Sequence, residues 1–211
     1  MGTGLDTTYN TETYNAASCL KDSGFTFIMR YYANSGNSKV LTASEAQYLS
    51  IAGFQIGVVF ETNPTYRDYF TTAQGTSDCQ TAVEYAYGTI GQPAGSAIYF
   101  AVDFDATAAE AAGVVTSYFK AINDELVNLQ NQGYPAYSIG VYGDGAVCSE
   151  LLSEGLVSFT WLAGSTGWTG SDTFTGWNLK QGSTSSSVCS ITYDPDESSG
   201  TFGGFNLATS V

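Results

Sequence analysis

The sequence predicts an α/β fold, a single-domain (β/α)8 barrel of the TIM type spanning residues 1–211. Three observations lead to this prediction. Apolar segments of strand-forming residues alternate with segments of helical spacing, which is typical of parallel βα units. The expected strands are nearly continuous apolar runs, as in a sheet that is buried on both faces. Eight such strands fit into 211 residues, and eight strands close a compact barrel.

The expected elements follow one another without a linker that would divide the chain. β-branched and aromatic runs predict strands at 3–7, 25–32, 54–61, 96–104, 137–143, 158–164, 175–182 and 188–194. Helical spacing, glycine stops and a Thr42 or Ser44 cap predict helices at 11–23, 42–53, 77–91, 107–132 and 145–155. Segments rich in Gly, Ser and Thr join the last three strands, so helices there are expected to be irregular or missing.

Acidic or polar residues recur where the expected strands end. Asp103 and Asp105 follow the apolar run 98–102. In a continued strand they would point the same way, with Cα atoms roughly 6.6 Å apart. A closed barrel gathers such ends into one ring, whereas the competing open, doubly wound sheet spreads them along an edge. The ring would contain Asp6, Arg30, Glu61, Asp103, Asp105, Gln181 and Asp194.

The composition excludes several classes of function. With 20 acidic and 6 basic residues, the formal charge is −14, so neither nucleic acid nor an anionic membrane surface is an expected partner. No apolar run reaches the ~18 residues that a membrane span needs. The absence of histidine removes Ser-His-Asp and Cys-His catalysis and the common zinc sites. Acid–base chemistry must then come from carboxylates, Tyr, Lys or Cys.

Four widely spaced cysteines, Cys19, Cys79, Cys148 and Cys189, lack the C-x-x-C spacing of metal clusters and thioredoxin-like motifs. Their even number, with few lysines and many Ser, Thr and Gly, predicts a secreted protein whose leader is absent from this sequence. Two disulfides of undetermined pairing are expected, and four buried free thiols are the alternative. Residues 194–200 lack the glycine and the closing Glu of a calcium loop. We expect a monomer without metal or cofactor.

A resemblance to a known family is carried by the segments GLDTTYN, FIMRYY, TASEAQYLSIAGFQIGVVFE, IYFAVDFDAT, IGVYG, LKQG and YDPD. They resemble the glycoside-hydrolase-like domain, formerly of unknown function, that is related to the family 25 lysozymes. The resemblance implies a flattened barrel with muramidase chemistry. The family's first-strand Asp, fourth-strand Asp-x-Glu and late Asp match Asp6, Asp103 with Asp105, and Asp194. Asp105 departs from the pattern, being shorter than Glu, and Glu61 matches another family acid.

Crowded carboxylates in a partly apolar pocket can supply both the protonated acid and the ionised carboxylate that a glycosidase needs. We expect Asp105 or Glu61 to donate the proton, and the more buried Asp103 to hold a neighbour or polarise the site. Asp6 and Asp194 would stabilise positive charge or orient the substrate. Each acid could instead simply cap the helix that follows its strand.

The remaining candidates would bind the substrate, a polysaccharide. Arg30 interrupts an apolar strand and is expected to pair with the acids, or to form a purely structural ion pair. Tyr32, Tyr142 and Trp161 could stack on sugar rings, or merely pack the barrel. Gln181 could bond a sugar hydroxyl or N-acetyl group.

The predicted function is hydrolysis of a cell-wall glycan, most specifically muramidase (lysozyme)-type cleavage of peptidoglycan by carboxylates alone. One alternative is a catalytically weak carbohydrate-binding or wall-associated module on the same barrel. Another is an amidase or a peptidase.

Overall fold

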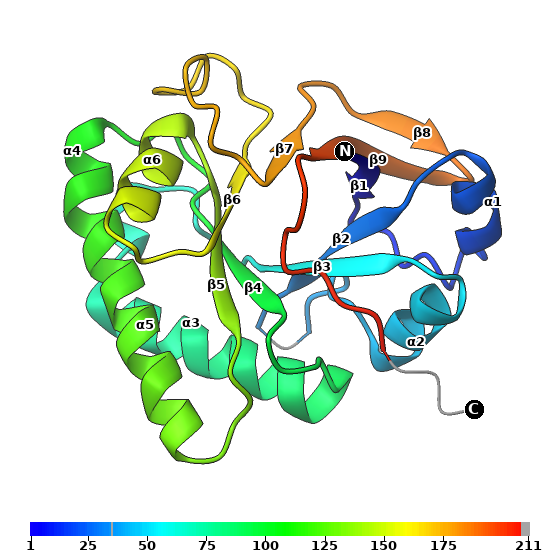
Figure 1. Cartoon of the computed structure of the whole chain (residues 1–211), viewed down its shortest axis with the longest axis horizontal. Helices are drawn as coiled ribbons and strands as arrows, with labels where there is room; N and C mark the ends of the chain where they lie inside the picture. The colour runs from blue at the N-terminus through cyan, green and yellow to red at the C-terminus, as the bar shows by residue number, and fades with distance from the viewer. Residues whose placement is uncertain (35, 208–211) are drawn as a thin grey trace.

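The computed structural model describes residues 1–34 and 36–207 and forms a closed eight-stranded barrel (Figure 1). The predicted fold class is confirmed. Around the barrel the order is β1-β2-β3-β4-β5-β6-β7-β9, and β9 pairs again with β1. The strands are β1 (Gly2–Asp6), β2 (Phe27–Tyr32), β3 (Gln55–Phe60), β4 (Ala97–Ala101), β5 (Ser138–Gly143), β6 (Phe159–Leu162), β7 (Leu179–Gln181), β8 (Ser186–Val188) and β9 (Ile191–Ser198).

Helices cover only part of the barrel. Figure 1 shows α3, α5 and α6 beside β4 and β5, and α1 and α2 near β2 and β3. Within the described residues no helix follows α6, as the sequence predicts. The helical segments are α1 (Ala17–Asp22), α2 (Ala43–Ile51), the 3-10 helix η1 (Arg67–Tyr69), α3 (Thr72–Tyr85) with the π-helical segment η2 (Ala86–Ile90), α4 (Ala108–Glu110), the π-helical segment η3 (Ala111–Val115), α5 (Thr116–Asn131) and α6 (Gly145–Ser153).

The last strand of the barrel differs from its expected form. Residues 188–194 do not make one parallel strand, because Cys189 and Ser190 adopt positive φ angles of 53° and 65° and form the turn of the β8–β9 hairpin. β9 therefore runs antiparallel to both β1 and β7. Antiparallel strands need only short connections, so this end of the barrel closes without a crossover helix. The pairing sets Asp194 opposite Asp6, and Asp196 opposite Gly4.

Side-chain alternation divides the barrel into two apolar layers. Inside the barrel, Gly4 leaves room for the ring of Phe27. A Cβ atom at position 4 would lie only 2.3 Å from that ring. The inward residues form one cluster, consisting of Phe27, Met29, Tyr31, Val59, Ala97, Tyr99, Ala101, Trp161, Leu179 and Phe202. A larger cluster lies between the outer face and the helices and includes Ile28, Tyr32, Val58 and Phe100.

One disulfide and two free thiols are present, which differs from both patterns considered from the sequence. Cys19 in α1 is bonded to Cys189 in the β8–β9 turn, across a separation of 170 residues. Cys79 and Cys148 are buried and unpaired, since their helices α3 and α6 pack each thiol into the apolar layer. The bond fastens the antiparallel hairpin to the first helix. In the described part of the chain, no helix is long and apolar enough to cross a membrane.

Thiol titration tests this pairing. We expect two reactive thiols per chain after unfolding without reductant, and far slower reaction in the native protein because Cys79 and Cys148 are buried. Reducing the Cys19–Cys189 bond should lower the free energy of unfolding by about 2–5 kcal/mol, because it closes a long loop in the unfolded chain. Urea unfolding with and without reductant measures the change. Four thiols or none would contradict the pairing.

Candidate active site

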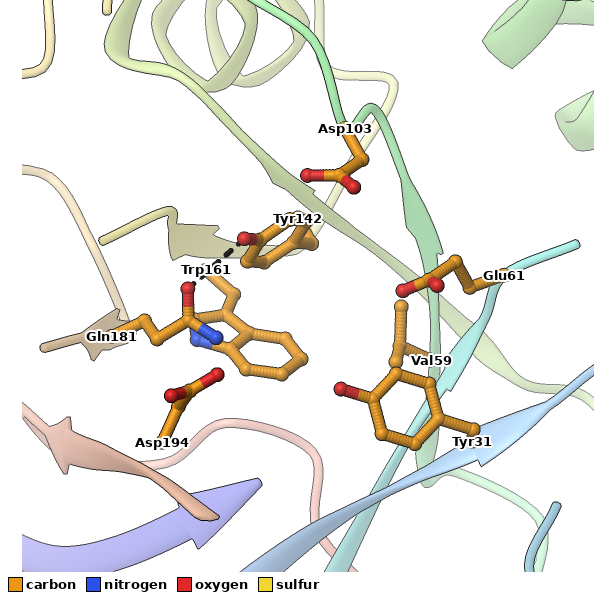
Figure 2. Close-up of a pocket in the computed structure, with 8 residues that line it drawn as sticks. All are labelled: Tyr31, Val59, Glu61, Asp103, Tyr142, Trp161, Gln181 and Asp194. Carbon is orange, nitrogen blue, oxygen red and sulfur yellow. Dashed lines mark hydrogen bonds between the residues drawn. The ribbon is translucent and has the colours of Figure 1, made fainter. Parts of the chain in front are cut away.

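A pocket of about 230 Å³ opens at the carboxyl ends of the parallel strands. Figure 2 shows Glu61 and Tyr31 on one side and Gln181 and Asp194 on the other, with Tyr142 and Trp161 between them. The pocket is lined by Tyr31, Val59, Glu61, Asp103, Tyr142, Trp161, Gln181 and Asp194. Six predicted site residues are thus brought together, namely Glu61, Asp103, Asp194, Tyr142, Trp161 and Gln181.

Glu61 and Asp103 provide two carboxyls in different electrostatic settings. Glu61 forms an ion pair with Lys39, whose Nζ lies 4.7 Å from the centroid of the Tyr31 ring. The Asp103 carboxyl accepts no hydrogen bond from the described residues. Burial, followed by the charge of Glu61, raises the pKa of Asp103, and the charge of Lys39 lowers it. Asp103 therefore holds a proton at higher pH than an exposed carboxyl does.

Asp6 lies beneath this pocket rather than among its lining residues. Its side chain is only 2% exposed. Its Oδ1 accepts a hydrogen bond from the Tyr31 hydroxyl (2.6 Å), and its Oδ2 accepts one from Nε2 of Gln181 (2.7 Å). Burial raises the pKa of Asp6 to about 7 against the effect of these hydrogen bonds, and the charges of Asp194 and Glu61 act in the same direction as burial.

The Gln181 amide links Asp6 to the opposite wall. Its Oε1 accepts hydrogen bonds from the Gly164 amide (3.1 Å) and the Tyr142 hydroxyl (3.0 Å). A backbone N–H can only donate, so the Gly164 contact fixes which end of the amide is oxygen. Nε2 must then face Asp6. Tyr31, Gln181 and Tyr142 are therefore held in place by a single buried carboxyl.

Asp105 lies outside the pocket, which corrects the expectation that it acts as the acid beside Asp103. β4 ends at Ala101, so strand alternation does not extend to Asp105. Its exposed carboxylate accepts hydrogen bonds from the backbone N–H (2.7 Å) and hydroxyl (2.8 Å) of Thr169, which lower its pKa. Asp105 therefore fastens the β6–β7 loop, and Thr107 is the residue that caps α4.

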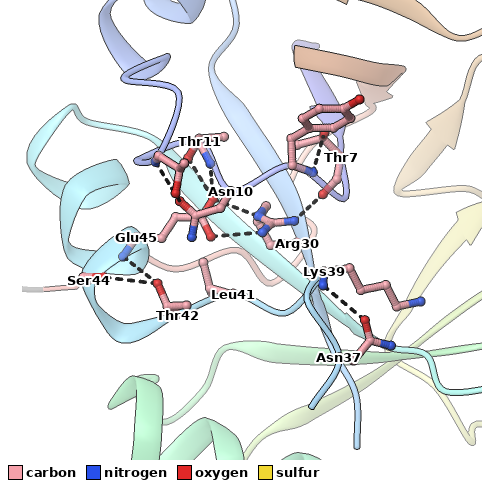
Figure 3. A network of polar contacts seen from close by, with 12 residues as sticks. Thr7, Asn10, Thr11, Arg30, Asn37, Lys39, Leu41, Thr42, Ser44 and Glu45 are labelled. Atoms are coloured by element: carbon pink, nitrogen blue, oxygen red, sulfur yellow. Dashed lines mark hydrogen bonds and ion pairs between the residues drawn. The ribbon is translucent and has the colours of Figure 1, made fainter. Parts of the chain in front are cut away.

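Arg30 and Tyr32 also lie away from the pocket, because even-numbered residues of β2 face the helices. Arg30 is fully buried and donates to Glu45 through Nε and Nη2, both at 3.0 Å, and to the carbonyl of Thr7 (Figure 3). The Tyr32 hydroxyl donates to Oε1 of Gln92 at 2.8 Å. Arg30 therefore forms a purely structural ion pair with Glu45 rather than pairing with the acids of the pocket. Tyr32 packs in the outer apolar layer. Neither can bind substrate in the pocket.

Three residues of the site were not among the predicted site residues. Tyr31 faces inward with Phe27 and Met29, so strict alternation along β2 indicates it. Asp196 is 2% exposed and accepts a hydrogen bond from Nε1 of Trp161 at 2.9 Å; its spacing of two from Asp194 is the corresponding signal. Lys39 lies in a loop without periodicity, where the sequence carries no comparable signal. Among residues 1–34 and 36–207, no three His, Cys, Asp or Glu side chains are placed to hold a metal ion.

A closed barrel with an acid-lined pocket at the carboxyl ends of its strands defines a glycoside hydrolase-like protein. More particularly, the chain belongs to the Rv2525c-like, glycoside hydrolase-like domain family, whose model matches residues 18–198. It is 32% identical over 170 residues to the uncharacterized protein YbfG of Bacillus subtilis, a match that covers 75% of this chain and 22% of YbfG. The chain spans about a quarter of the length of the curated relatives it matches.

Solved structures share the barrel at low sequence identity. The Tat-secreted protein Rv2525c of Mycobacterium tuberculosis superposes with a TM-score of 0.76 at 20% identity, covering 96% of this chain and 98% of that one. The autolysin LytC of Streptococcus pneumoniae gives 0.58 at 15% identity (92% and 46% covered), and a muramidase of Trichobolus zukalii gives 0.55 at 14% (95% of each). The predicted relation to family 25 muramidases is confirmed at the level of the fold.

Substitution of Glu45 tests the structural role of Arg30. Glu45→Gln leaves the Arg30 charge buried without its partner, so we expect the free energy of unfolding to fall by about 3–5 kcal/mol. The matched control is Glu154→Gln, which breaks the exposed pair with Lys120 and should change stability by less than about 1 kcal/mol. Urea unfolding measures both. Equal losses in the two variants would refute the assignment.

Proposed function

We propose that this chain is a glycoside hydrolase that cleaves a cell-wall glycan of amino sugars in the Glu61–Asp103 pocket. One observation carries the proposal. Two carboxyls line the same pocket in different surroundings: Glu61 forms an ion pair with Lys39, whereas burial raises the pKa of Asp103. A glycosidase requires such a pair, one member acting as general acid and the other as an ionised carboxylate.

In the proposed reaction Asp103 donates its proton to the oxygen of the glycosidic bond as the bond to the sugar carbon breaks. The Glu61 carboxylate stabilises the positive charge that develops on the sugar, and either activates a water molecule or bonds to the sugar carbon. Asp194 orients the substrate from the opposite wall. Tyr142 supplies aromatic surface for the sugar ring, whereas Trp161 lines the pocket but is only 1% exposed. Asp103 thus takes the proton-donor role that the sequence assigned to Asp105 or Glu61, in place of the polarising role expected for Asp103 itself.

Peptidoglycan is the proposed substrate and an exported protein the proposed setting. The substrate is supported by the shared fold with a muramidase and with an autolysin solved with a synthetic peptidoglycan ligand. Export is supported by the Cys19–Cys189 disulfide and by the Tat-secreted relative. We also propose that residues 1–211 act as one domain around this pocket.

Release of reducing ends from peptidoglycan tests the catalytic roles. Asp103→Asn and Glu61→Gln keep the side-chain shapes but remove the acid and the charge, so we expect each to lower the rate by about 100-fold or more. Asp105→Asn is the matched control and should change the rate by less than about tenfold, because its carboxylate bonds Thr169 outside the pocket. An Asp105 variant as inactive as the Asp103 variant would contradict these roles.

The pH dependence of the rate tests the protonation of Asp103. A general acid must hold its proton, so the rate should fall as pH rises through the raised pKa of Asp103. Lys39 lowers that pKa. Lys39→Met should therefore move the falling limb to higher pH. A limb that does not move, or that moves to lower pH, would exclude Asp103 as the acid.

A second candidate function is glycan binding without cleavage. The specific observation in its favour is Asp105, which stands at the position of the family 25 acid but is turned to Thr169. Pull-down on insoluble peptidoglycan measured beside reducing-end release separates the two functions. Binding without release at any pH from about 3 to 8 would establish the binding module and end the catalytic proposal.

A further inference from the structure

A second pair of carboxyls lies beneath the pocket, on the paired strands β1 and β9. Asp6 and Asp196 are each 2% exposed, and Asp196 stands opposite Gly4, two residues deeper in the barrel than the Asp6–Asp194 pairing. The two carboxyls lie close enough that the charge of Asp6 raises the pKa of Asp196. Oδ1 of Asp196 accepts from Trp161, but its buried Oδ2 has no donor among the described residues.

Among the residues that the structure describes, no cation compensates this pair. The ion pairs of the described residues involve other carboxylates. Lys39, at the pocket, is bound to Glu61, and Arg30 faces away from the barrel interior toward Glu45. Two buried, adjacent and uncompensated carboxylates are strongly unfavourable, because burial removes their hydration and each repels the other. A single proton between them removes one charge and gives the orphaned oxygen a partner.

The hydrogen bonds show which carboxyl should hold that proton. Asp6 accepts from two donors, Tyr31 and Gln181, and these favour its ionised form. Asp196 accepts from one donor only, and its second oxygen is free to carry a hydrogen. We propose that Asp196 is a positioning residue that keeps its proton at neutral pH and donates it from Oδ2 to Asp6.

Through this hydrogen bond Asp196 would influence the side chains that line the pocket, although Asp196 itself would not contact a ligand. Asp6 holds the Tyr31 hydroxyl and the Gln181 amide, and Gln181 holds Tyr142; all three side chains line the pocket. Asp196 therefore fixes the carboxyl on which their positions depend. Burial, followed by the charge of Asp6, raises the pKa of Asp196. The other titratable groups around the pair are Asp194, Glu61, Tyr31, Tyr99 and Tyr142.

The indole N–H of Trp161 reports on Asp196 in the unmodified protein. The chain has 3 tryptophans, so its indole N–H region in an ¹H–¹⁵N NMR spectrum is simple, and Trp161→Phe identifies the signal. We expect the Trp161 signal to show no titration step near the ordinary Asp pKa of about 4. A step with its midpoint near that value would show that Asp196 ionises like an exposed carboxyl and would overturn the proposal.

The stability of Asp196→Asn provides an independent test. The asparagine can accept from Trp161 and donate to Asp6, but it holds no titratable proton. In the wild type the folded chain keeps a proton that the unfolded chain loses above about pH 4, so stability falls as pH rises. Urea unfolding at several pH values between about 5 and 8 gives the unfolding constant of each protein. For each unit of pH, the constant of the wild type should rise by up to about tenfold more than the constant of Asp196→Asn does.

Asp22→Asn, on an exposed residue of α1, is the matched control and should keep the wild-type slope. Equal slopes in the wild type and Asp196→Asn would overturn the proposal. Neither experiment contains a glycan. The proposal for the Asp196 proton can therefore be refuted while the proposed hydrolysis stands, and the hydrolysis can be refuted while the Asp196 proposal stands.

Discussion

Strand β9 closes the barrel by pairing antiparallel with both β1 and β7, and the arrangement of the acids depends on this pairing. The reversed direction brings Asp194 opposite Asp6 at the mouth and places Asp196 one inward position deeper. A parallel last strand would reach the mouth with its carboxyl end instead. The Cys19–Cys189 disulfide fastens the turn that starts β9, so the covalent bond and the acid pairing belong to the same part of the fold.

Burial and hydrogen bonding act in opposite directions on these acids, and the balance differs from residue to residue. Asp105 is exposed and bonded to Thr169, so its pKa falls. Asp103 is half-buried and lies near the charge of Glu61, so its pKa rises. Asp6 has two donors, yet burial prevails and raises its pKa to about 7. One strongly acidic chain thus contains carboxyls suited to fastening a loop, donating a proton and orienting neighbours.

The position of Asp105 shows that the shared barrel does not by itself determine which residue acts as the acid. The barrel is shared with muramidases, but Asp105, which the sequence resemblance matches to the family's acid, is hydrogen-bonded to Thr169 of the β6–β7 loop. Asp144 strengthens the same region, since its carboxylate caps α6 at Val147 (2.7 Å) and accepts from Ala106 (2.8 Å). A fold supports many activities, so the pocket carboxyls Glu61 and Asp103, rather than the barrel, carry the functional argument.

The sequence by itself determined the barrel, most of its helices and six of the eight residues that line the pocket, because apolar periodicity and strand ends are local properties of the chain. It also left the role of Arg30 open between two readings. Tertiary structure decided the direction of β9, the single disulfide, the outward turn of Asp105 and the pairing of Lys39 with Glu61. These depend on where β4 stops, on how the last hairpin turns and on which charges meet across the mouth. Such contacts join residues that are far apart in the sequence, and local periodicity carries no information about them.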